Sequence, residues 1–165
     1  MAYRCAQLLK ASRVGHWCMG VSESVYIQLK NVLSKVRENL PDLEGVLVAG
    51  RDGLLMAAEM TEGVDSEQLA AMAATLLATS ENALARTGRG KLRKVMASGE
   101  NGDLIVVGAG EAVIAALTGR NPVRGLFFLV LETAATQVES IVKSWTEKMA
   151  GGEQAGLKPP SPPVV

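Results

Sequence analysis

Apolar residues in this 165-residue chain alternate between helix-like and strand-like patterns. From Ser22 to Leu40 they recur every three or four residues, which is typical of one face of an amphipathic helix. Two short apolar runs follow between Gly45 and Met60 and flank the tripeptide Arg51-Asp52-Gly53. Because Asp-Gly favours the tight turn of a β-hairpin, the pattern predicts a helix followed by two paired strands.

An alanine-rich helix is expected next, with Asp65 as its N-cap. Gln68 stands three residues later, in the position of a capping-box partner, and Gly88 is placed where glycine commonly ends a helix. Apolar periodicity within this segment indicates which side chains face inward. The expected inner face comprises Leu69, Met72, Ala73, Leu76, Leu77, Ser80, Ala83 and Leu84.

Three strand-like segments follow at 91–98, 103–109 and 112–118, separated by short turns that contain glycine. Such turns predict an antiparallel meander. The run GLFFLVL that comes after them looks like a buried strand, yet a helical period persists from Val123 to Met149. Asn121 and Pro122 match an N-cap and first-turn pair, so we expect one helix from Pro122 to Met149.

The predicted order is therefore helix-strand-strand-helix-strand-strand-strand-helix, an α+β fold in which helices cover an antiparallel sheet. We expect one domain over residues 21–149. Residues 1–20 are expected to form an N-terminal extension outside the domain, because Met19-Gly20 stands directly before a clear helix start. Residues 150–165 lack apolar periodicity and are expected to form a flexible, proline-rich tail.

Composition narrows the possible partners and cofactors. Basic and acidic residues both number 17, so no net charge favours nucleic acid. The two cysteines, Cys5 and Cys18, and the single histidine, His16, all lie near the N-terminus, which disfavours a disulfide scaffold, a metal site or any other cofactor. No apolar run approaches the length of about 20 residues that spans a bilayer. We therefore expect a soluble, cytoplasmic protein.

Catalysis is weakly supported. Asp52 has the residue type of a general base, but its place before Gly53 favours a structural role in a turn. The GAGE motif at 108–111 lacks both the spacing of a dinucleotide-binding loop and the lysine of a P-loop, so a turn between strands is favoured there. We expect neither enzymatic activity nor intrinsic nucleotide binding.

Two local features allow alternative interpretations. The first is a run of basic residues without an acid: Arg86, Arg89, Lys91, Arg93 and Lys94. We favour the interpretation that these residues lie in a solvated loop and protect an edge strand. The alternative is that they bind an acidic partner or a phosphate. The second is a set of methionines, for which core packing is favoured over an adaptable binding surface: Met56, Met60, Met72 and Met96.

The chain resembles the roadblock family in its order of elements and in four segments. These are the hairpin LEGVLVAGRDGLLMAAEM, the helix that begins at Asp65, GDLIVVGAGEAVIAALTG and NPVRGLFFLVLETAATQVESIV. That family includes dynein light chains and prokaryotic regulators encoded beside Ras-like GTPases, and this sequence is more similar to the prokaryotic group. The resemblance implies a roadblock/profilin-like sandwich. Its five-stranded antiparallel sheet carries the Asp65 helix on one face and the two terminal helices on the other.

The resemblance also implies a homodimer that joins the third strands and brings the Asp65 helices together. It implies a non-catalytic regulator of a Ras-like small GTPase, which activates or localises that GTPase. A scaffold subunit comparable to a dynein light chain, and a small-ligand sensor that uses the same sheet, remain alternatives. The expected dimer or partner interface comprises Met72, Thr75, Thr79, Asn82, Arg86, Leu92, Lys94 and Met96.

A GTPase activator can also supply an arginine to the transferring phosphoryl group. The candidates for such a role are Arg51, Arg86, Arg89, Arg120 and Arg124. The roadblock family shares no such arginine, so contacts that reorganise the switch loops of the GTPase are the favoured mechanism.

Overall fold

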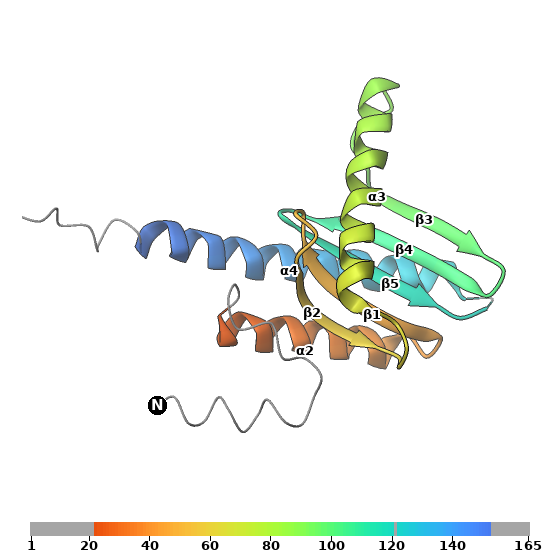
Figure 1. Ribbon diagram of the computed structural model, residues 1–165, viewed down its shortest axis with the longest axis horizontal. Helices are drawn as coiled ribbons and strands as arrows, with labels where there is room; N and C mark the ends of the chain where they lie inside the picture. Colours follow the sequence, from red (N-terminus) through yellow and green to blue (C-terminus); the bar gives the residue numbers. More distant parts are fainter. Residues whose placement is uncertain (1–21, 121, 153–165) are drawn as a thin grey trace, which may run out of the picture.

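The computed structural model describes residues 22–120 and 122–152 and follows the predicted order of elements (Figure 1). The elements are α2 (Glu23–Asn39), β1 (Leu43–Gly50), β2 (Leu55–Met60), α3 (Ser66–Arg86), β3 (Lys94–Gly99), β4 (Gly102–Ala109), β5 (Ala112–Thr118) and α4 (Arg124–Gly152). The strands form one antiparallel sheet in the order β2-β1-β5-β4-β3. The sheet carries α3 on one face and α2 with α4 on the other, which confirms the expected α+β sandwich.

The sheet separates two apolar cores because alternate side chains of each strand point to opposite faces. In β1, Val46 and Val48 pack toward α2 and α4, whereas Leu47 and Ala49 pack toward α3. All four side chains are fully buried, so both faces of this strand are covered. This double burial explains why the sequence of β1 is a continuous apolar run rather than an alternating one.

The inner face of α3 agrees with the expected one in part. Ala73 and Leu77 are buried as expected, and Leu69 and Leu76 pack half-buried against the same core. Ala70 and Ala74 are buried as well, whereas Met72 and Ala83 are exposed. Small side chains let the helix backbone approach the sheet closely, and the backbone at Gly53 comes near Ala71 in the same way. A Cβ atom added at Gly53 would lie 3.0 Å from the Cα of Ala71. Alanines and leucines therefore share the face of α3 that packs on the sheet.

The third strand begins at Lys94, three residues later than expected. Gly88 and Gly90 have positive φ angles of 67° and 86°, and the amide of Arg89 donates to the carbonyl of Leu84. These features curl the chain into a loop after α3. Leu92 accordingly lies in the loop before β3, where it packs half-buried against the core beneath α3.

The final helix confirms that GLFFLVL is helical, but the helix begins at Arg124 rather than at Pro122. The amides of Leu126 and Phe127 donate to the carbonyl of Val123, which places the first turn after Val123. The helix also continues three residues beyond the expected end at Met149. Asn121, the proposed extension 1–20 and most of the proposed tail lie outside the described residues.

Within the described residues, α4 is long and apolar enough over Arg124–Ala150 to cross a membrane by length and composition alone, with a mean hydropathy of 1.4. The sequence did not predict such a helix, because isolated polar residues divide the apolar sequence of this segment. One stripe of α4 packs on the sheet through buried residues that include Phe127, Leu131 and Val138.

Candidate interaction surface

Helix α3 extends beyond the sheet beside an open strand edge. It contacts all five strands, yet none of its residues after Leu77 is buried. Figure 1 shows the C-terminal turns of α3 standing clear of the sheet near β3, the strand that ends the sheet on that side. The exposed half of a helix therefore lies next to an edge with unpaired backbone groups.

The outer face of α3 gathers most of the predicted interface. Met72, Thr75, Thr79, Asn82 and Arg86 are all exposed and recur every three or four residues, opposite the buried alanines. The side chain of Met72 is 58% exposed, which corrects its assignment to the core. Before Arg86 this face carries no charge, so a partner can cover it without desolvating an ion.

The predicted residues of β3 lie on the other side of the sheet from α3. Lys94 and Met96 pair with Val107 and Ile105, whose side chains belong to the core under α2 and α4. Lys94 is fixed there, because its ammonium lies 3.2 Å from a carboxylate oxygen of Glu132 and 3.7 Å from the ring centre of Phe128.

The predicted interface is therefore divided between the two sides of one edge. Val95 and Ala97 are the β3 residues that share the α3 side, since they pair with Val106 and Leu104. Neither residue was predicted from the sequence. Side chains two residues apart in a strand point to the same face of the sheet, so the face of Val95 also gives that of Ala97. The sequence does not show on which face Val95 lies.

The other three methionines differ in how deeply they are buried. Met56 is buried, as expected of core packing, and Met60 is half-buried. Met96 is 39% exposed at the sheet edge, so it is not a core residue within the described chain.

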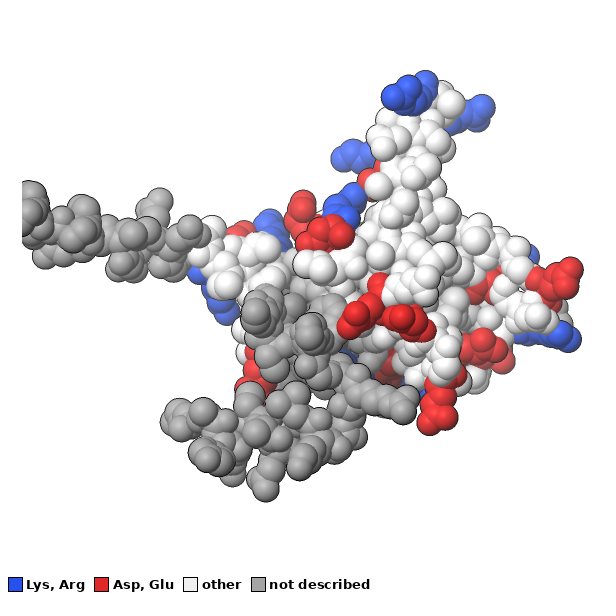
Figure 2. Space-filling model, viewed as in Figure 1, with Lys and Arg blue, Asp and Glu red and all other residues white. Residues whose placement is uncertain are grey.

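Charges of opposite sign mark the two ends of α3. We define the basic end as Arg86, Arg89, Lys91 and Arg93, which are exposed and make no ion pair with other described residues. Figure 2 shows Lys and Arg side chains gathered around the projecting end of α3. We define the acidic end as Glu62, Asp65 and Glu67. Asp65 caps the helix as expected, since its carboxylate accepts the amides of Glu67 and Gln68 at 3.0 and 3.1 Å.

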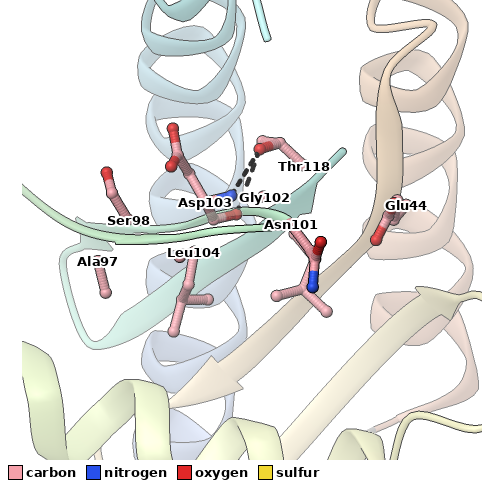
Figure 3. Close-up of a pocket in the computed structure, with 10 residues that line it drawn as sticks. Glu44, Ala97, Ser98, Asn101, Gly102, Asp103, Leu104 and Thr118 are labelled. Carbon is pink, nitrogen blue, oxygen red and sulfur yellow. Dashed lines mark hydrogen bonds between the residues drawn. The ribbon is translucent and has the colours of Figure 1, made fainter. Parts of the chain in front are cut away.

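A shallow depression of about 430 Å³ lies beside α3 at the end of the sheet that this helix leaves uncovered. Ala97, Leu104 and Leu117 occupy adjacent strands in register and form its apolar floor, with Glu44 at the rim. Figure 3 shows Ala97 and Leu104 pointing to one side of the sheet and Asp103 to the other. Leu104 and Leu117 are only half-buried, unlike the fully buried Val106 and Ala115 beneath α3.

Three of the five candidate arginines are engaged within the fold. Arg51 donates to the carbonyl of Gly110 at 2.6 Å and to both carboxylate oxygens of Glu81 at 2.7 and 3.1 Å. The hydrogen bond with Glu81 raises the pKa of Arg51 above its ordinary value, so the guanidinium stays charged. Arg124 lies 3.0 Å from the buried carboxylate of Asp103, and Arg120 donates to the side chain of Asn101.

The Arg51 contacts join the β1–β2 turn, the β4–β5 turn and α3. Replacing Arg51 with Met keeps much of the aliphatic stem but removes these hydrogen bonds, so we expect a loss of about 1 kcal/mol in the free energy of unfolding. Urea denaturation measures the loss, with Arg37→Met, an exposed position on α2, as the control. Equal stability of both variants would show that the contacts do not anchor α3.

Two further candidates have structural roles. The carboxylate of Asp52 accepts the amide of Leu54 at 3.1 Å within the hairpin turn, as expected of a turn residue. Residues 108–111 lie at the β4–β5 turn, where Gly110 has a φ of 62°. Among the residues that the structure describes, no group of three His, Cys, Asp or Glu side chains lies close enough to hold a metal ion.

Comparison with known proteins agrees with this geometry, an α+β domain in which a helix projects past the edge strand β3. The sequence pattern of the Roadblock/LC7 domain matches residues 29–118. The chain is 32% identical over 99 residues to the uncharacterized protein MJ0310 of Methanocaldococcus jannaschii, a match that covers 60% of this chain and 87% of that protein. The chain belongs to the Roadblock/LC7 domain family.

Solved structures support the same fold. The gliding protein MglB of Thermus thermophilus superposes with a TM-score of 0.67 at 18% identity, covering 77% of this chain and 97% of that one. MglB of Myxococcus xanthus gives a TM-score of 0.68 at 17% identity, covering 76% of this chain and 96% of that one. At such identities the likeness concerns the fold alone.

Proposed function

We propose that this chain is a non-catalytic, homodimeric regulator of a Ras-like small GTPase in the cytoplasm. The observation that carries the proposal is the uncharged, exposed outer face of α3 beside the open edge of β3. Membership of the Roadblock/LC7 domain family supports it. Depletion of charged residues is typical of the buried centre of sites for protein partners.

The dimer follows from the open edge. An isologous contact between two antiparallel β3 strands removes the unpaired edge and continues the sheet into the second copy. Such pairing requires a two-fold axis perpendicular to the sheet. That axis keeps both α3 helices on the same face and makes them antiparallel, so the two helices together offer one platform to the GTPase.

The platform is expected to act by contact rather than by chemistry. Helix contacts that favour one arrangement of the GTPase switch loops change its hydrolysis rate without a group from the regulator entering the active site. Single-turnover GTP hydrolysis by a Ras-like GTPase from the same genome, with and without the protein, tests the proposal. A changed rate supports it. Binding at an unchanged rate would favour a scaffold role, and failure to bind every such GTPase would refute the proposal.

Arg86 and Arg89 are the candidate arginines that stay unpaired within the described residues. If contacts alone reorganise the switch loops, the Arg86→Ala and Arg89→Ala variants should each retain GTP turnover within about tenfold of the unmodified protein. Turnover at saturating regulator separates this effect from weaker binding. A loss of several orders of magnitude in one variant would identify a catalytic arginine and contradict the contact mechanism.

A further inference from the structure

The second edge of the sheet, β2, carries a lysine contact. This strand ends the sheet on the side opposite β3, and α2 runs beside it (Figure 1). The ammonium of Lys30 on α2 donates to the backbone carbonyl of Ala58 at 3.0 Å. The same ammonium lies 3.3 Å from a carboxylate oxygen of Glu59. A side chain of the helix layer therefore reaches the backbone of an edge strand.

The register of β2 shows that this carbonyl points out of the sheet. The amide of Thr61 donates to the carbonyl of Glu44, so these two residues form a hydrogen-bonded pair just beyond the strand. Hydrogen-bonded and non-bonded pairs alternate along an antiparallel ladder. The pair of Leu47 with Ala58 is therefore non-bonded, and Ala58 directs its amide and carbonyl away from β1. A further strand would need both groups in order to pair with β2.

Glu59 holds Lys30 in this position. Glu59 pairs with Val46, whose side chain belongs to the core under α2 and α4, so its carboxylate points beneath α2. Its side chain is 15% exposed and also accepts the hydroxyl of Ser34 at 2.8 Å. A strand that displaced the ammonium would leave this carboxylate largely buried without its counter-ion, which is costly. A lysine and an inward-pointing charge are both known to prevent the pairing of edge strands.

The edge formed by β3 lacks such a contact. Within residues 22–120 and 122–152, no side chain hydrogen-bonds to the backbone of β3. The strand contains one basic residue, Lys94, but its ammonium lies against Glu132 and Phe128 of α4 instead. The two edges therefore differ, because a side chain occupies the backbone of β2 whereas that of β3 is available to a second chain.

We infer that Lys30, positioned by Glu59, closes the β2 edge and so limits sheet pairing to one contact per chain. In the proposed dimer the two β2 strands are the outer edges of the continuous sheet. Pairing of β2 strands would join dimers into an open-ended sheet, because each added dimer exposes another edge. The closure depends on contacts within one chain, and its effect on the size of the assembly rests on the proposed dimer.

Lys30→Met tests the inference, because it keeps an unbranched side chain but removes the donor to Ala58. At concentrations where the unmodified chain reaches twice 17.3 kDa, sedimentation velocity should show the variant in species of about four chains and more. Hydrogen exchange should show the amides of Ala58 and Met60 protected in those species. Lys30→Arg keeps a charged donor and should retain the unmodified mass, as should the control Lys35→Met, at an exposed position of the same helix.

A second substitution shows whether the heavier species form through β2. Proline at position 58 removes the outward amide, but it leaves the hydrogen bonds to β1 because Ala58 belongs to a non-bonded pair. Lys30→Met combined with Ala58→Pro should therefore return to the unmodified mass. Each variant should keep the circular dichroism spectrum of the unmodified chain, which separates strand pairing from aggregation of unfolded chains.

Three results would overturn the inference: a Lys30→Met variant that stays at the unmodified mass, heavier species that persist with Ala58→Pro, or β2 amides that are already protected by association of the unmodified chain. A different result would refute the proposed dimer alone. If the unmodified chain stays monomeric at every concentration while Lys30→Met gains mass and protects its β2 amides, the dimer fails and the closure of β2 stands.

Discussion

Thr79→Glu is expected to raise the dissociation constant of the proposed dimer by about 100-fold, with a matching loss of the effect on GTP hydrolysis. Thr79 is exposed at the centre of the uncharged outer face of α3, one turn before the projecting end. In the proposed dimer the two-fold axis repeats each contact of α3, so position 79 of both copies lies in the contact between the helices. The substitution therefore buries two like charges in one contact.

The control for this variant is Thr133→Glu. Thr133 is also exposed on a helix, but it lies on α4, across the sheet from α3. Sedimentation and single-turnover hydrolysis on both variants distinguish a specific effect from the cost of placing glutamate in a helix. Full self-association and full activity of Thr79→Glu would show that the outer face of α3 is not the interface.

The largest expected effect on stability is that of Phe127→Ala, a loss of about 3 to 5 kcal/mol in the free energy of unfolding. Phe127 is 1% exposed and packs in the core that α2 and α4 form with the sheet. Alanine leaves a cavity that the surrounding strands can fill only in part. A loss of this size is a large fraction of the stability of a typical domain.

Leu129→Ala is the matched control for that prediction, because Leu129 lies two residues further along α4 and is 65% exposed. We expect its free energy of unfolding to change by less than about 0.5 kcal/mol. Urea denaturation of both variants decides whether α4 is a core helix. Equal effects at the two positions would contradict the packing described for this helix.

The order of elements was predictable because hydrophobic periodicity and turn residues agree along most of the chain. The β1–β2 hairpin is the clearest case, since Asp52 and Gly53 supply the backbone conformations that its turn needs. The helical state of GLFFLVL was also predictable, but only over a window long enough to separate a period of 3.6 from a buried strand.

The arrangement of the candidate interaction surface was only partly predictable. Met72, Thr75, Thr79, Asn82 and Arg86 follow from the outer face of a helix and do lie together. To predict the β3 residues, one must know where the strand begins and on which side of the sheet each side chain lies. Neither is encoded locally in the sequence. The loop at Gly88 and Gly90 shortens the strand, and pairing with β4 places Lys94 and Met96 away from α3.

The inner face of α3 illustrates a second limit. Periodicity correctly identified Ala73 and Leu77, and Leu69 and Leu76 pack half-buried against the same core. It missed Ala70 and Ala74 and placed Met72 and Ala83 inward, although both are exposed. Alanine occurs on every face of this helix, so the sequence does not reveal which alanines are buried.

Hydrogen exchange of the β3 amides, measured together with the mass in solution, decides whether two copies pair through β3. We expect the mass of the full chain to rise from 17.3 kDa to twice that value as concentration increases. We also expect amides within Lys94–Gly99 to become protected over the same concentration range, as the open edge pairs with a second copy. A mass that doubles while these amides exchange unchanged, or a mass that never doubles, would contradict this pairing.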